Sequence, residues 1–144
     1  MPLQLSDIKS MLENINANKD GHFSKDPEPI AILNERISLL IRDTVIHLSE
    51  FVIAKVKGKI PALNYHPEIT DDIFISLPSI IQYPQQVLKD TRASGKYLFI
   101  IESPFIEVVI EVRRIDSGKT EINTLHKITI EELKRLERKF PVVL

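Results

Sequence analysis

The segment Lys96–Ile128, KYLFIIESPFIEVVIEVRRIDSGKTEINTLHKI, contains the pattern that decides the fold. Apolar and polar residues alternate through it, as they do in β-strands that bury one face. Asp116–Gly118 has the composition of a three-residue hairpin loop, and Ser103-Pro104 that of a second turn. The sequence therefore predicts three consecutive antiparallel strands.

These two turns also predict how the strands pair. Ile115 then faces Lys119, and Ile101 faces Ile106, which brings charged residues opposite one another. Three pairs of opposite charge result: Arg113 with Glu121, Glu107 with Lys127, and Lys96 with Glu111. Since opposite charges are favoured at facing positions of a sheet, this agreement supports the predicted pairing.

Each face of the predicted sheet has an exception to its pattern. The core face is apolar apart from Thr124 and His126, which stand where apolar side chains are expected. The charged face also holds an apolar strip, made of Leu98, Ile100, Val109 and Leu125. If no other element covers this strip, we expect it to be an interface.

The N-terminal part reads as helical. Ile8, Met11, Leu12 and Ile15 have helical spacing, and a polar loop follows at 16–29. Between Pro29 and Gly58, apolar residues repeat at helical spacing in two stripes, which predicts one long helix. Its second stripe would be free to contact a partner, most simply a second copy of the chain.

The whole pattern predicts one α+β domain over 1–144. A helical part at 1–58 precedes an α+β part at 59–144. In that second part, Gln86–Asp90 adds a strand to give an antiparallel sheet of about four. The capping box at Thr129–Glu132 opens a C-terminal helix.

Composition excludes several classes of function. A net charge of −1 argues against a general nucleic-acid coat, so any contact with RNA must be local. The chain has no cysteine, which excludes disulfides and thiolate sites, and its histidines lack the spacing of zinc ligands. We expect neither a metal nor another cofactor. No signal peptide or membrane span is visible, so the expected location is the cytoplasm.

Two histidines each have two possible interpretations. His126 is either a hydrogen-bonded histidine at the sheet rim or a proton-transfer residue beside Thr124 and Tyr97. His66 is either part of a helix entry or a site residue, held in a loop that Pro67 constrains.

The C-terminal two-thirds of the chain resembles the barnase–EndoU–colicin–RelE-like nucleases of phage and toxin systems. The similarity covers about residues 60–128. It is carried by His66-Pro67-Glu68, Leu77-Pro78, Tyr83-Pro84, Val87, Asp90, Lys96-Tyr97-Leu98-Phe99, Val108 to Val112 and Thr124. The resemblance implies N-terminal helices followed by a four-stranded antiparallel sheet.

It also implies a metal-independent endoribonuclease of toxin type, which cleaves RNA by attack of the substrate's own 2′-hydroxyl. Carried over to this chain, it makes the following residues candidates: His66, Lys96, Thr124 and His126 for catalysis, and Arg92 and Tyr97 for substrate binding. RNA is then the expected partner.

Two alternatives remain: an inactive member of the same fold, or a non-enzymatic module that binds a second copy or a small protein.

Overall fold

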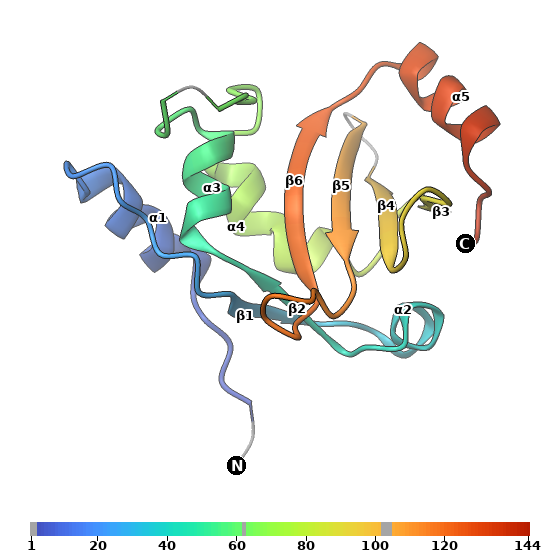
Figure 1. Cartoon of the computed structure of the whole chain (residues 1–144), viewed down its shortest axis with the longest axis horizontal. Coiled ribbons are helices and arrows are strands. Elements are labelled where there is room, and N and C mark those ends of the chain that lie inside the picture. Colours follow the sequence, from blue (N-terminus) through green and yellow to red (C-terminus); the bar gives the residue numbers. More distant parts are fainter. Residues whose placement is uncertain (1–2, 62, 102–104) are drawn as a thin grey trace.

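The computed structural model describes residues 3–61, 63–101 and 105–144. Five helices and six strands make up this part of the chain (Figure 1). The helices are α1 (Ile8–Ala17), α2 (Glu35–Ile41), α3 (Glu50–Val56), α4 (Asp71–Ile80) and α5 (Ile130–Lys139). The strands are β1 (Glu28–Ile32), β2 (Val45–Leu48), β3 (Gln86–Lys89), β4 (Lys96–Ile101), β5 (Ile106–Glu111) and β6 (Glu121–Lys127). The α+β class is confirmed.

The strands form one mixed sheet in the order β1-β2-β6-β5-β4-β3. Neighbouring strands are antiparallel except for β2 and β6, which run parallel and pair only through His47 and Glu121. The predicted antiparallel sheet of about four strands is therefore wrong as a description of the whole sheet, which has six strands and is mixed; β3–β6 form its antiparallel part.

Helices cover both faces of the sheet (Figure 1). The larger apolar cluster joins α1, α3 and α4 to one face, with Phe74 and Phe99 fully buried in it. A smaller cluster joins the opposite face to α5 through Leu98, Ile100 and Leu133. Burial of apolar side chains on both faces stabilises this three-layer arrangement.

The predicted long helix between Pro29 and Gly58 is wrong. The segment contains β1, α2, β2 and α3 instead. Asn34 caps α2 by accepting a hydrogen bond from the Ile37 amide, and Arg42 ends that helix in the left-handed conformation at φ 60°. Ser49 then caps α3. Apolar residues at helical spacing also fit short strands. The caps at Asn34 and Ser49 begin two short helices here, in place of one long helix.

The predicted pairing is correct for one hairpin and wrong for the other. Between β4 and β5, Lys96 faces Glu111 and Ile101 faces Ile106, as predicted. The turn predicted at Ser103-Pro104 lies outside the described residues.

Between β5 and β6, Glu107 faces His126 rather than Lys127, and Glu111 rather than Arg113 faces Glu121. Two features cause the difference. The connection after Glu111 is longer than the predicted three-residue loop, and a β-bulge follows it, because Ile110 faces Ile122 whereas the neighbouring Val109 faces Thr124.

This shift moves side chains across the sheet. Successive residues of a strand point to opposite faces, so a slip by one residue exchanges the faces. Thr124 and His126 consequently lie on the α5 face rather than on the core face, while Leu125 lies in the larger core.

The expected apolar strip on the charged face is also not exposed. Leu98 and Ile100 are buried against Leu133 and Phe140, which flank or belong to α5. The capping box predicted for this helix is present between Thr129 and Glu132. The strip that favoured an interaction module is thus covered by internal packing, and of the predicted second helical stripe Ile46 and Ile53 are buried whereas Ile32 and Leu39 are exposed.

Among the residues that the structure describes, no helix is both long enough and apolar enough to cross a membrane.

Candidate functional site

His66 lies in the connection between α3 and α4, and local contacts fix its backbone. Its amide donates to the Val56 carbonyl at 2.8 Å, and its carbonyl accepts from the Ile69 amide at 3.0 Å. Ile69 is buried and anchors the far side of the loop. The loop therefore holds His66 firmly beside the end of α3.

His126 meets His66 from the other side. The two imidazole rings stack with centroids 5.0 Å apart and an interplanar angle of 29°. A carboxylate accompanies each ring: Glu107 Oε1 lies 3.3 Å from His126 Nε2, and Glu68 Oε1 lies 3.6 Å from His66 Nδ1. We call these four residues the histidine site.

The histidine site lies along a free edge of β6. Because β2 contacts this strand only at Glu121, the backbone further along β6 lacks a strand neighbour on that side. Side chains bond it instead: Lys55 Nζ donates to the Asn123 carbonyl at 2.8 Å, and the Lys127 amide donates to Glu68 at 3.4 Å. Glu68 thus links the strand edge to His66.

Burial favours the neutral form of both imidazoles. It lowers the pKa of His66 below its usual value of 6.5, and the neighbouring His126 lowers it further. Burial also lowers the pKa of His126, although Glu132 and Glu68 oppose the effect. The buried Nδ1 of His126 has no hydrogen-bond partner among the described residues. Neutral imidazoles with a free nitrogen are able to accept protons near neutral pH.

Glu107 is shifted in the opposite sense. Only 7% of this residue is exposed, and burial raises its pKa above the usual value, with a further contribution from Glu132. The carboxyl of Glu107 and the imidazole of His126 are therefore both biased toward their uncharged forms. Such opposed shifts within one contact are typical of sites where protons are exchanged.

A small cavity of about 150 Å³ opens between His126 and α5. Glu107 and His126 line it from the sheet, and Glu132, Arg135 and Lys139 line it from the helix. His66 does not line this cavity, although its ring contacts that of His126. Two cations are thus available beside one of the two imidazoles.

The other sequence-predicted residues separate into two groups. Thr124 lies on the same face as His126, two residues earlier on β6, which corresponds to roughly 7 Å along the strand. Lys96 lies on β4 four residues before Ile100, the residue that faces Glu107, so it is roughly 13 Å further along the sheet.

Arg92 and Tyr97 lie with Lys96 at that distant end. Arg92 pairs with Asp90 at 3.2 Å, and Tyr97 packs under the ammonium of Lys89. The structure does not bring these cations to the histidines.

Sequence reasoning missed the two carboxylates as partners of the histidines. The register predicted from the turns pairs Glu107 with Lys127. In the structure the β-bulge brings Glu107 opposite His126 instead. Glu68 stands two residues after His66, a spacing that carries no signal by itself. Within the described part of the chain, no group of three histidine or acidic side chains has the geometry to hold a metal ion.

Comparison with models of protein families gave no match, and neither did comparison with curated proteins or with solved structures. The resemblance to the nuclease group therefore stays a prediction, and the functional argument depends on the geometry of the histidine site.

Proposed function

We propose that this protein is a metal-independent endoribonuclease that uses His66 and His126 for proton transfer. The observation that carries the proposal is the contact between the two imidazoles, which come from distant parts of the chain and each lie beside a carboxylate. RNA carries its own nucleophile, the 2′-hydroxyl, so cleavage needs a base, an acid and a group that stabilises the charged phosphate.

The two imidazoles are similarly exposed, at 30% for His66 and 26% for His126, and we assign their roles from the carboxylate beside each. His66, beside Glu68, accepts the proton of the 2′-hydroxyl. His126, in contact with Glu107, holds the one proton of the pair before cleavage and donates it to the leaving 5′-oxygen, while His66 gains the proton of the 2′-hydroxyl. Since two charged imidazoles would repel each other at this distance, the pair carries one proton at a time. Glu107 acts as a positioning residue that orients His126.

Arg135 and Lys139 supply the positive charge that the phosphate requires. Both line the cavity that His126 borders, whereas Arg92 and Lys96 lie at the far end of the sheet. A guanidinium binds two phosphate oxygens at once, which suits Arg135 to the charged transition state. In this proposal α5 provides part of the active site.

Incubation of the purified protein with RNA in EDTA tests the proposal. We expect products with 2′,3′-cyclic phosphate ends, as required by attack of the 2′-hydroxyl. His126→Ala is expected to abolish them, whereas His22→Ala, at an exposed histidine of the α1–β1 loop, retains them. Absence of cleavage by the wild type, or equal cleavage by His126→Ala, contradicts the proposal.

A further inference from the structure

A cavity larger than the one beside α5 lies where the chain that follows β2 diverges from β6. Beyond the pairing of His47 with Glu121, a pocket of about 670 Å³ lies between β6 and the segment that follows β2, from Ser49 to Lys55. We call it the fork pocket; its walls include Lys25, Phe51, Lys55, Arg114, Asp116 and Glu121. Its volume is in the range of cavities that hold small organic molecules.

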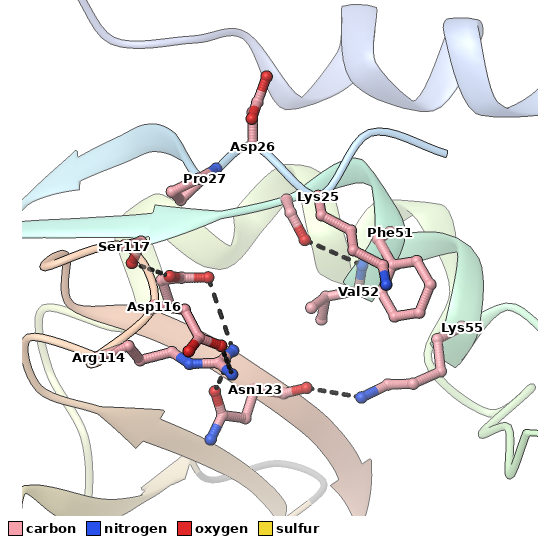
Figure 2. A pocket seen from close by; sticks show the side chains of 12 residues that line it. Lys25, Asp26, Pro27, Phe51, Val52, Lys55, Arg114, Asp116, Ser117 and Asn123 are labelled. Carbon is pink, nitrogen blue, oxygen red and sulfur yellow. Dashed lines mark hydrogen bonds and ion pairs between the residues drawn. The ribbon is translucent and has the colours of Figure 1, made fainter. Parts of the chain in front are cut away.

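One wall of the fork pocket is cationic and aromatic. Figure 2 shows Lys25, Phe51 and Lys55 together on this side, and the Lys25 ammonium lies 4.8 Å from the centre of the Phe51 ring. Lys55 Nζ uses one proton for the Asn123 carbonyl at 2.8 Å. The remaining protons of both ammonium groups are suited to bind an anion.

The opposite wall is acidic. Glu121 is only 5% exposed and accepts a hydrogen bond from Ser117. Asp116 lies beside Ser117 (Figure 2). Asp26 also borders the pocket, but Figure 2 shows its carboxylate directed away from these side chains. This wall offers carboxylate oxygens to a ligand that carries N–H groups.

Arg114 lies between the two walls, paired at long distances with three carboxylates and donating to Asn123 Oδ1 at 3.5 Å. Its nitrogens are 3.7 Å from Glu111, 3.5 Å from Asp116 and 3.9 Å from Glu121. Charge-assisted hydrogen bonds between such groups are usually about 2.7–2.9 Å long. The guanidinium therefore retains donors and a flat surface for a ligand.

The local backbone is shaped around this pocket. Arg113, next to Arg114, adopts a left-handed φ of 43°, and Asn123 is the extra residue of the β-bulge. Bulges and left-handed residues other than glycine are enriched beside binding sites, where they redirect side chains. Here they direct Arg114 and Asn123 to the pocket.

We propose that the fork pocket binds one nucleotide of the RNA substrate, an inference that rests on the proposed ribonuclease function. The phosphate lies between Lys25 and Lys55, and the base stacks on Phe51 or Arg114. The edge of the base faces Glu121 and Asp116. Single-stranded RNA is bound in this manner, through cations on the backbone, stacked rings and hydrogen bonds to base edges.

The acidic wall predicts which bases are preferred. Carboxylates accept hydrogen bonds, and guanine, adenine and cytosine present exocyclic amino groups, whereas uracil lacks an amino group and presents one ring N–H between two carbonyl oxygens. When this N3–H donates to Glu121, both flanking oxygens of uracil come close to the carboxylate and repel it. The pocket therefore favours bases with an amino group over uracil.

Its distance from the histidine site suits neighbouring nucleotides of one strand. Asn123 precedes His126 by three residues, or roughly 10 Å along β6. Lys55 connects the two places, because it bonds Asn123 and lies close enough to His66 to lower its pKa. RNA that follows the free edge of β6 thus reaches both.

Binding of nucleoside 3′-monophosphates, measured by calorimetry, tests the fork pocket without the need for cleavage. We expect the wild type and His126→Ala to bind GMP, AMP and CMP at least roughly fivefold more tightly than UMP. Lys25→Gln and Lys55→Gln each weaken binding at least roughly fivefold, and Lys19→Gln, at an exposed lysine of the α1–β1 loop, does not. Glu121→Gln removes the preference against UMP.

The outcomes separate this inference from the proposed function. If the nucleotides fail to bind, or Lys25→Gln binds them as well as Lys19→Gln does, the fork pocket is not a nucleotide site even where RNA is cleaved. If they bind with the expected pattern while RNA stays intact, the pocket is a nucleotide site and the ribonuclease proposal fails. Lys25 is exposed, so its variant is expected to fold and keeps the test decisive.

Discussion

The two ends of the β4–β5 hairpin differ in how their charged side chains are satisfied. At one end, Arg92 donates to the buried carboxylate of Asp90, and Lys96 faces Glu111 across the strands. At the other end, His126 and Glu107 are both biased against their charged forms. Charges that stabilise each other belong to the structure, whereas groups held in unfavourable protonation states indicate chemistry. The candidate residues from the sequence lie at both ends. The contrast in protonation assigns a structural role to those at the first end and a catalytic role to those at the second.

The largest expected effect is the loss of cleavage when either histidine is removed. His66→Ala should lower kcat/KM about 10²- to 10⁴-fold, the usual contribution of a proton-transfer group. Arg92→Gln, at the opposite end, should change it by less than about threefold. Measurement of RNA cleavage under identical conditions compares the ends directly. A larger loss in Arg92→Gln than in His66→Ala would reverse the assignment.

Removal of a structural charge should instead affect stability. Asp90 is only 4% exposed and accepts bonds from the amide and side chain of Arg92. Asp90→Ala is expected to lower the free energy of unfolding by about 0.5–1.5 kcal/mol, because the Arg92 amide loses its hydrogen-bond acceptor. Urea unfolding measures this effect, and the remaining folded protein should keep its specific activity. Unchanged stability would show that the ion pair adds nothing.

The two ends should also lose stability in different ranges of pH. Folding lowers the pKa of His66 and His126 below 6.5, so the unfolded chain binds more protons as the pH falls. Their contribution is present above pH 6.5 and is lost as the pH decreases through the folded pKa values. Asp90, whose pKa the neighbouring Arg92 lowers below 3.8, contributes stability that is lost only below that pH.

Urea unfolding at a series of pH values checks both ranges. His126→Gln should reduce the slope that begins near pH 6.5, and His22→Gln, at the exposed loop, provides the matched control. Glu107 acts in the opposite direction, since its pKa is raised and its contribution declines as the pH rises. An identical slope in wild type and His126→Gln would contradict the described burial.

The smallest effect is expected for the cross-strand pair. Lys96→Gln should reduce stability by about 0.2–1 kcal/mol, the usual range for a facing pair of opposite charge, and should leave cleavage unchanged. Thermal unfolding and the cleavage assay together give both values. A loss of activity without a loss of stability would show that Lys96 takes part in cleavage, as the resemblance implies.

The meander could be predicted from the sequence because alternation and turn composition act locally. They gave the correct pairing of Lys96 with Glu111 and the correct C-terminal capping box. The bulge at Asn123 could not be predicted, since an extra residue in a strand depends on contacts with the rest of the fold. That single residue moved His126 from the core to the α5 face.

The N-terminal part shows the limit of periodicity. Apolar residues between Pro29 and Gly58 fit a helix, yet Val45–Leu48 gains more by pairing with β1 and β6. For the site, the sequence supplied His66 and His126 as separate candidates. Their contact, and the carboxylates beside them, depend on the folding of the α3–α4 loop against the free edge of β6.

The double variant His66→Ala/His126→Ala tests most directly whether the two histidines act as one proton-transfer pair. Residues that act as a unit are not additive, so the double variant should cleave RNA about as slowly as the slower single variant. The measurement is kcat/KM for the four proteins in EDTA. Losses that multiply, or a single variant with wild-type activity, would contradict the central claim.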